Sequence, residues 1–240
     1  MMFRNAYTAL PTPFTPEGGR VDFDALEARI QYQASAGITG VVPCGTTGET
    51  PTLSNQERQS IVAHSVNVAQ SLGIQVIAGA GANSTITAIE YQKQMEDAGA
   101  DATLQVVPYY NKPSQEGLFR HFHTIADVAE VPIVLYDVPG RVGTGFTVDT
   151  VVRLSEHPRI AAIKAASGSL EFVTEVVQRC SLPILSGDDG LTLSIMGLGG
   201  VGVISVVSNL VPQLMQSMCI EANRGEQALA RSHHDKIFPL

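Results

Sequence analysis

Short apolar runs recur along the chain, and longer segments in which apolar residues have helical spacing separate them. Most of these runs show no alternation of polar and apolar residues, which is typical of parallel strands covered on both faces. Two runs begin with a proline, Pro132 and Pro183, at a position where a strand tolerates the missing amide donor. We expect strands at residues 6–10, 40–44, 75–80, 102–107, 132–137, 160–165, 183–187 and 202–207.

The segments between these runs begin and end with residues that favour helix boundaries. Ser54 and Glu57 have the spacing of a capping box, which leads into an apolar helix face. Further candidates for N-cap residues are Ser84, Ser114, Thr147 and Ser169. A glycine in the left-handed conformation is expected to end three helical segments just before a strand, at Gly37, Gly73 and Gly99.

Eight strand–helix units are complete by about residue 222, which is the number in a (β/α)8 barrel. A doubly wound open sheet is the alternative, but eight uninterrupted units favour closure. We therefore expect an α/β protein with a TIM-barrel catalytic domain at residues 1–222. Residues 223–240 are expected to form the start of a truncated C-terminal helical segment, and no linker indicates a second domain.

With 240 residues the chain is long enough to bury one large core. Its net charge of −8 argues against nucleic acid or an anionic membrane as a partner, so a small anionic substrate needs local cations. No apolar run approaches the roughly 20 residues that span a bilayer, and the N-terminus lacks the apolar region of a signal peptide. We expect a cytoplasmic protein. Its scattered cysteines, Cys44, Cys180 and Cys219, indicate small buried side chains and no disulfide framework.

Functional side chains of a barrel gather at the carboxyl ends of its strands. At these positions the sequence places Thr12, residues 45–50, 81–83, 108–117 and 136–141, Lys164, residues 187–189 and Ile204. This ring is rich in hydroxyl groups and contains no His/Cys cluster with metal-ligand spacing, so we expect no metal. The histidines of 121–123 and 233–234 fall in helical segments, and we expect them at the surface.

Residues 197–202, GLGGVG, match the glycine spacing of a dinucleotide-binding turn. Such a turn follows a strand and opens a helix, whereas these glycines precede a strand. We therefore expect no dinucleotide to bind there.

Lys164 lies in the apolar run IAAIKAASG, residues 160–168, where a lysine is unusual. Its side chain either reaches solvent from the end of the strand or enters the mouth of the barrel. In the second case, loss of hydration lowers the pKa of the amine, and the neutral amine can attack a carbonyl to form a Schiff base. Tyrosine and threonine hydroxyls on the same rim can carry protons between the intermediates, and Arg141 can bind a carboxylate.

Five segments of this rim resemble, in order and spacing, motifs of the dihydrodipicolinate synthase family, a group of class I pyruvate-dependent lyases. The segments are GTTGET (45–50), PYYNKPSQEG (108–117), YDVPGR (136–141), IKAASG (163–168) and GVISV (202–206). The resemblance extends from about Tyr7 to the end of the chain. It implies an enzyme of lysine and diaminopimelate biosynthesis that condenses pyruvate with L-aspartate-4-semialdehyde to 4-hydroxy-tetrahydrodipicolinate, as a homodimer or homotetramer.

The resemblance also implies a role for each catalytic side chain. Lys164 forms the imine with pyruvate, which serves as the electron sink, so that no cofactor is needed. Tyr136 protonates and deprotonates the intermediates. Its hydroxyl is linked by hydrogen bonds to Thr46 and to Tyr110, and Tyr110 reaches in from a neighbouring subunit.

The same resemblance implies where the substrates bind. It places the carboxylate of pyruvate near Thr46 and Thr47, and the carboxylate of aspartate semialdehyde on Arg141. The carbonyl of Ile204 and Gly187 lie on the same rim.

The sequence departs from the family pattern in three places. Asp137 stands where an asparagine is common after the tyrosine. The chain stops at Leu240, whereas family members usually continue with further helices. Members inhibited by lysine tend to carry histidines and an acidic residue around a pocket near the subunit interface, where this chain has Asn55, Arg58 and Thr87. We therefore expect weak or absent inhibition by lysine.

Two other functions remain open on the sequence. The first is a related aldolase that acts on a sugar-derived 2-keto acid, of the N-acetylneuraminate lyase or 2-keto-3-deoxy-gluconate aldolase type, against which Arg141 and the Thr46–Thr47 pair argue. The second is a non-catalytic binding barrel, which would form no borohydride-trapped adduct with pyruvate.

Overall fold

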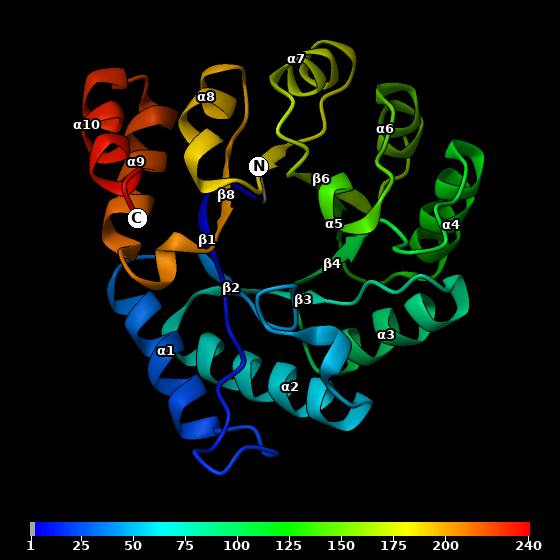
Figure 1. Cartoon of the computed structure of the whole chain (residues 1–240), viewed down its shortest axis with the longest axis vertical. Helices are drawn as coiled ribbons and strands as arrows, with labels where there is room; N and C mark the ends of the chain where they lie inside the picture. Colours follow the sequence, from blue (N-terminus) through cyan, green and yellow to red (C-terminus); the bar gives the residue numbers. More distant parts are fainter. Residues whose placement is uncertain (1–2) are drawn as a thin grey trace.

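The computed structural model describes residues 3–240 and shows eight parallel strands that form a closed barrel in chain order (Figure 1). The strands are β1 (Asn5–Ala9), β2 (Gly40–Val42), β3 (Gln75–Gly79), β4 (Ala102–Val106), β5 (Ile133–Asp137), β6 (Ile160–Ala165), β7 (Ile184–Ser186) and β8 (Gly202–Ser205). β8 pairs with β1, from Asn5 opposite Gly202 to Thr8 opposite Ser205, and this pairing closes the barrel. The predicted barrel is confirmed, and the open sheet is excluded.

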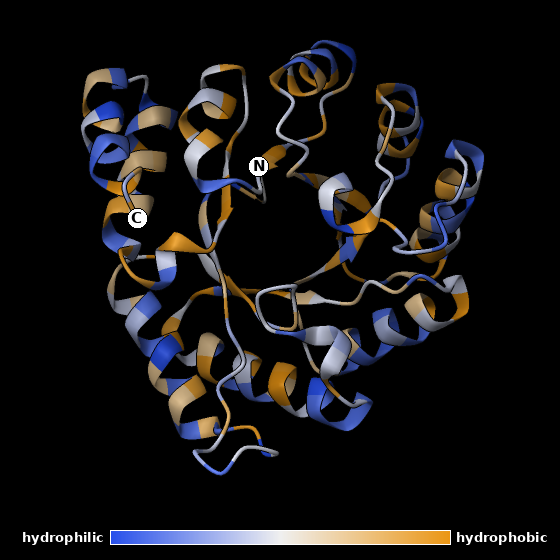
Figure 2. Cartoon of the chain, viewed as in Figure 1, coloured by the Kyte–Doolittle hydropathy of each residue, from blue (hydrophilic) through white to orange (hydrophobic). Residues whose placement is uncertain are grey.

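Helices surround the barrel on its outside (Figure 1). They are α1 (Phe23–Ser35), α2 (Asn55–Leu72), α3 (Thr85–Asp97), α4 (Gln115–Val128), α5 (Pro139–Val142), α6 (Val148–Ser155), α7 (Leu170–Arg179), α8 (Thr192–Gly197), α9 (Pro212–Arg224) and α10 (Gln227–Ile237). Short 3₁₀ turns occur at Thr50–Thr52, Asp189–Leu191 and Val207–Asn209. Figure 2 shows mainly apolar strands and hydrophilic residues on the outer sides of the helices, as a core between the two layers requires.

The helix boundaries follow the capping residues that the sequence indicated. Ser54 forms a complete capping box with Glu57 at the start of α2. A side-chain oxygen also caps five other helices: those of Ser84, Ser114, Thr147 and Ser169 were expected, and Asp22 caps α1 in the same way. The glycines expected after helices have positive φ angles, of 79° at Gly37, 69° at Gly73 and 86° at Gly99.

The last helix, α10, packs against the barrel through the same apolar cluster as α8 and α9. This cluster includes Ala230 and Ile237 of α10, Met215 and Met218 of α9, and Val203 of β8. The expected division of the chain after residue 222 falls near the end of α9 and stays a prediction. The glycines of 197–202 run from the last residue of α8 to the first residue of β8, so they precede a strand as the sequence indicated. No helix of residues 3–240 is long and apolar enough to cross a membrane.

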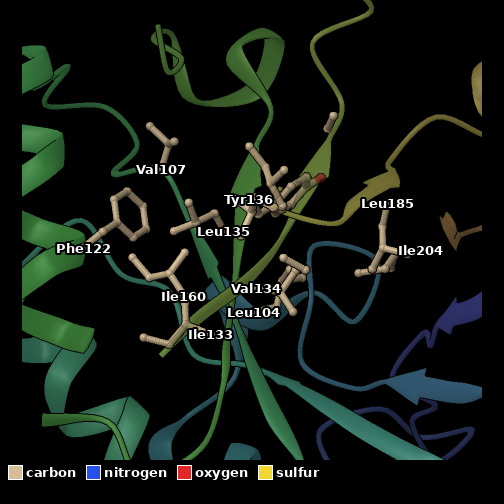
Figure 3. Close-up of a cluster of buried hydrophobic side chains, with 14 of the residues drawn as sticks. Leu104, Val107, Phe122, Ile133, Val134, Leu135, Tyr136, Ile160, Leu185 and Ile204 are labelled. Carbon is tan, nitrogen blue, oxygen red and sulfur yellow. The ribbon is translucent and has the colours of Figure 1, made fainter. Parts of the chain in front are cut away.

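Consecutive residues of β5 point to opposite sides of the barrel wall (Figure 3). Val134 and Tyr136 lie inside the barrel, whereas Leu135 lies on the outer side, towards Phe122 of α4. This alternation carries Tyr136 into the mouth of the barrel.

One expectation about the histidines is wrong. His121 is 5% exposed, and its Nδ1 atom lies 2.9 Å from Thr85 Oγ1. It occupies the face of α4 that also carries Leu118, Phe122 and Ile125, because residues three and four apart share one side of a helix. Burial lowers the pKa of His121 to about 4, so the ring is neutral at pH 7.

Candidate active site

Lys164 enters the mouth of the barrel from the end of β6. It stands directly opposite Tyr136 of β5 in the strand register. The residue is 6% exposed, and its Nζ atom lies 4.2 Å from the centroid of the Tyr136 ring. Of the two positions that the sequence left open for this side chain, the structure shows the buried one.

The surroundings of Lys164 favour the neutral amine. Burial lowers its pKa to about 8, while the negative charges of Asp189 and Asp188 oppose this change and the positive charge of Arg141 adds to it. No carboxylate of the described residues forms an ion pair with Lys164. An amine with this pKa is a much better nucleophile near neutral pH than an ordinary lysine, because more of it is unprotonated.

A cavity of about 100 Å³ opens next to the lysine. Residues from the ends of seven strands line it: Ala9, Val42, Gly45, Thr46, Thr47, Leu104, Tyr136, Val138, Arg141, Lys164, Ala166, Gly187, Asp188 and Val206. The lining combines one amine, one guanidinium, several hydroxyl groups and the carboxylate of Asp188 with apolar side chains, and its size and its cations suit a small keto acid.

Gly187 provides part of the space that Lys164 occupies. A Cβ atom at this position would lie 2.6 Å from Ala166 Cβ and 3.0 Å from Lys164 Cε. Any side chain there would therefore displace the lysine or the wall beside it. This role is steric, and the backbone of Gly187 also borders the cavity.

The phenol of Tyr136 is held in its neutral form. Burial raises its pKa, and the neighbouring Thr46 side chain and the positive charge of Arg141 counter part of that rise. A neutral phenol can both donate and accept a proton, so it can serve as an acid–base group beside the lysine.

The turn that carries Thr46 and Thr47 is fixed from its outer side. Thr12 Oγ1 donates a hydrogen bond of 2.7 Å to the carbonyl oxygen of Gly48, and the Gly48 amide bonds to Gly45 O at 3.1 Å. The sequence placed Thr12 on this rim, and the structure shows that it supports the turn. Both threonines line the cavity as predicted.

Arg141 lies on the short helix α5 and is exposed at the edge of the cavity. It also borders a second cavity of about 550 Å³, which shares Thr46, Val138 and Arg141 with the first. The two cavities therefore adjoin each other at these three residues. A ligand in the first can extend towards Arg141.

Arg58 of α2 lies in the wall of the larger cavity and is almost fully buried. Its guanidinium carbon is 3.6 Å from the centroid of the Tyr91 ring, and its Nη2 atom donates a 3.0 Å hydrogen bond to Asn55 Oδ1. Among residues 3–240, no carboxylate forms an ion pair with it. The cavity therefore has a positively charged wall.

Tyr110 does not line the catalytic cavity of its own chain. The residue is 90% exposed, and its backbone has a φ of 73°, which is uncommon for a residue other than glycine. Asn83 Nδ2 bonds to the Tyr109 carbonyl at 3.2 Å, and Asn111 Nδ2 bonds to the Asn83 carbonyl at 3.0 Å. These bonds fix a loop in which Tyr110 is exposed to solvent, while Tyr109 lines the larger cavity.

Ile204 lies in β8 with its side chain fully buried beside Leu185 (Figure 3). Its side chain is not part of the cavity lining, whereas Val206, two residues later, is. Within the described part of the chain, no group of three His, Cys, Asp or Glu residues is arranged to hold a metal.

Two aspartates of the site were assigned no role from the sequence. Asp188 lines the cavity, and Asp189 carries the nearby charge that most opposes the fall in the pKa of Lys164. Asp189 Oδ2 also accepts hydrogen bonds from the amides of Val206 and Val207, at 3.1 and 3.0 Å. The sequence could have indicated both aspartates as site residues, because they directly follow a strand and therefore lie on the same rim as Lys164.

Comparison with known proteins identifies the chain's relatives. Residues 2–240 match the model of the dihydrodipicolinate synthetase family. A 4-hydroxy-tetrahydrodipicolinate synthase from Leptospira biflexa is 45% identical over 241 residues, which cover 100% of this chain and 81% of the relative.

Solved structures agree with this match. The dihydrodipicolinate synthase from Thermotoga maritima superimposes with a TM-score of 0.96 at 36% identity, over 100% of this chain and 82% of that one. The enzyme from Cyanidioschyzon merolae, solved with lysine bound, has a TM-score of 0.94 at 40% identity and covers 97% of this chain and 80% of its own.

Proposed function

The chain belongs to the dihydrodipicolinate synthetase family, and we propose that it condenses pyruvate with L-aspartate-4-semialdehyde to give 4-hydroxy-tetrahydrodipicolinate. The observation that carries this proposal is the buried Lys164 amine, unpaired with any described carboxylate, at the base of a cavity that leads to Arg141. The reaction belongs to lysine and diaminopimelate biosynthesis.

The first half of the reaction activates pyruvate. The neutral amine of Lys164 attacks the keto carbon, and the resulting carbinolamine loses its oxygen as water to leave a protonated imine. Loss of a proton from the methyl group then gives an enamine, with the imine nitrogen as the electron sink. Tyr136 supplies and removes the protons, because its phenol is neutral and close to Lys164.

The second half forms the carbon–carbon bond. The enamine carbon attacks the aldehyde carbon of the semialdehyde, and the aldehyde oxygen takes up a proton. The amino group of the second substrate then attacks the imine carbon, which closes the ring and releases Lys164. The net change is loss of one water molecule, and the enzyme returns to its starting state.

Local cations and donors hold the two acidic substrates. The hydroxyls and amides of the Thr46–Thr47 turn suit the carboxylate of pyruvate, since they border the cavity beside Lys164. Arg141 suits the carboxylate of the semialdehyde, because a guanidinium binds a carboxylate through paired hydrogen bonds. In a chain with a net charge of −8, such local groups have to supply the attraction.

The exposed Tyr110 supports an active site completed by a second copy of the chain. A large aromatic side chain held outward by its own backbone is suited to insertion into a neighbour. We infer a homodimer or a higher oligomer in which Tyr110 of one copy approaches Thr46 and Tyr136 of the next. The cytoplasmic location also stays a prediction from the sequence.

The larger cavity bears on regulation by lysine. Its wall carries Arg58, which forms no ion pair with a carboxylate of the described residues, so a second cation beside this guanidinium would be repelled. The presence of Arg58 therefore favours weak or absent inhibition by L-lysine, in contrast to the relative solved with lysine bound.

A coupled assay that offers two classes of substrate tests the proposed function. Purified protein should consume pyruvate with aspartate semialdehyde, and should show no comparable cleavage of N-acetylneuraminate or 2-keto-3-deoxy-gluconate. The names of the relatives favour the first activity. Faster turnover of a sugar acid would overturn this assignment and restore the alternative.

A further inference from the structure

Asp137 follows Tyr136 as the last residue of β5, but its side chain projects from the opposite face of the barrel wall. Alternation along a strand puts neighbouring side chains on opposite faces, as Figure 3 shows for Leu135 and Tyr136. Asp137 is 1% exposed, and its carboxylate oxygen Oδ1 accepts a 3.1 Å hydrogen bond from the backbone amide of Phe146. It therefore lies behind the active site and does not line it.

The bond between Asp137 and Phe146 closes the segment that carries Arg141. Residues 138–146 follow Asp137 at the end of β5 and include α5. The segment ends at Phe146, whose backbone amide bonds to the Asp137 carboxylate. Gly145 allows this close approach, because a Cβ atom there would lie 2.9 Å from Asp137 Oδ1 and 3.3 Å from Pro139 Cβ. The segment is thus a closed turn whose two ends meet at one side chain.

Other contacts hold the base of this turn against the rest of the barrel. The Ala166 amide donates a 2.9 Å hydrogen bond to the Asp137 carbonyl, which ties the near end to β6. Gln115 of α4 donates to the Gly145 carbonyl at 2.9 Å and accepts from the Thr147 amide at 3.0 Å. The Phe146 ring packs 5.1 Å from Phe122, centroid to centroid.

We propose that Asp137 is a positioning residue for the second substrate: its bond to the Phe146 amide sets the place of Arg141 above the cavity. This inference rests on the proposed function, because it needs Arg141 to bind the carboxylate of the aldehyde. The pyruvate subsite lies on a different segment, the turn of Thr46 and Thr47, which Thr12 supports separately. Loss of the Asp137 bond should therefore affect the aldehyde and leave pyruvate binding intact.

The carboxylate suits this task, although its burial is unfavourable. Burial raises the pKa of Asp137 to about 6, so the group is mostly ionised at pH 7 to 8, and an ionised acceptor forms a stronger bond with an amide than a neutral one. An asparagine side chain also has an oxygen that can accept the bond. Acceptance of this bond, and not the charge, is the property that the proposal requires.

Steady-state kinetics of Asp137→Ala and Asp137→Asn test the proposal. We expect Asp137→Ala to raise the KM for aspartate semialdehyde about tenfold, as expected for loss of one charge-assisted bond, with an unchanged KM for pyruvate. Borohydride trapping of the pyruvate adduct should proceed at the wild-type rate. Asp137→Asn should restore the aldehyde KM to within about threefold of wild type, because its amide oxygen can accept the bond.

A second variant keeps the test decisive where Asp137→Ala fails to fold. Gln115→Ala loosens the far end of the same turn from a half-buried position on α4, and should raise the aldehyde KM in the same selective way. Asp149→Asn on the exposed face of α6 is the matched control, and both KM values should stay unchanged.

Equal changes in the two KM values, or an aldehyde KM that stays unchanged in Asp137→Ala and Gln115→Ala, would overturn the proposal. Failure of the proposed function would give a different result from failure of the Asp137 proposal. If the proposed function is wrong, the wild-type protein itself would form no pyruvate adduct or would not consume the aldehyde.

Discussion

Lys164 and Tyr136 face each other across β5 and β6, with the lysine Nζ atom 4.2 Å from the centre of the tyrosine ring. The ring covers one side of the amine and removes it from water, while the phenol lies on the same rim as the threonines. This arrangement combines an amine with a lowered pKa, which we propose as the nucleophile, and a phenol with a raised pKa, which we propose as the acid–base group. Both shifts arise mainly from burial.

Tyr136→Phe separates the two roles of the tyrosine. The ring that shields Lys164 stays, whereas the hydroxyl that moves protons is lost. We expect kcat to fall by about 10²- to 10⁴-fold, as is typical for removal of a general acid–base group. The trapped pyruvate adduct should still form, but more slowly. Thermal unfolding by circular dichroism should match wild type, and a kcat within a few-fold of wild type would contradict the assigned role.

The pH dependence of adduct formation reports the pKa of Lys164. Because this pKa is lowered to about 8, the neutral fraction of the amine increases with pH and reaches one half near pH 8. The rate of borohydride-trapped adduct formation should rise about tenfold per pH unit below this value and level off above it. An increase that continues to about pH 10 would indicate an ordinary, solvated lysine instead.

A mixed dimer tests whether Tyr110 crosses between subunits. Lys164→Ala and Tyr110→Phe should each be nearly inactive alone. If Tyr110 serves the neighbouring site, one site of the mixed dimer carries both changes and the other carries neither. Co-expression with two tags and purification of the doubly tagged species should then recover about half of the wild-type activity per dimer.

If Tyr110 serves its own chain, each site of the mixed dimer carries one change. Activity no higher than that of the single variants, in a confirmed mixed dimer, would therefore show that the tyrosine does not cross.

Inhibition by L-lysine tests the interpretation of the larger cavity. Because Arg58 is unpaired with any described carboxylate and buried in its wall, submillimolar L-lysine should leave the initial rate unchanged. Arg58→Met removes the positive charge while keeping a long side chain, and serves as the comparison. Half-maximal inhibition of the wild-type protein at submillimolar L-lysine would contradict this expectation.

The strands and most helix starts were predictable because their signals are local. A parallel strand covered on both faces appears as an uninterrupted apolar run, and an N-cap needs one side chain at one position. The place of a site residue on the rim also follows from the predicted strands, since the carboxyl ends of all eight strands lie at one end of the barrel. Lys164, Thr46, Thr47, Arg141 and Gly187 were found in this way.

The remaining features depend on contacts that no local pattern encodes. His121 is buried because its face of α4 meets Thr85 at the start of α3, 36 residues earlier in the chain. The carboxylates of Asp137 and Asp189 bind backbone amides 9 and 17 residues away, and such partners become visible only when the turns have folded. The family resemblance implied that Tyr110 reaches a neighbouring subunit, but the left-handed backbone of Tyr110 is a property of the folded loop.

Imine formation at Lys164 is tested by the mass of the intact protein after borohydride reduction in the presence of pyruvate, followed by peptide mapping. We expect one reduced pyruvate adduct per chain, located on the peptide that contains Lys164, and no adduct in Lys164→Ala protein that retains its fold. An adduct on any other lysine, or no adduct in the wild-type protein, would contradict imine formation at Lys164.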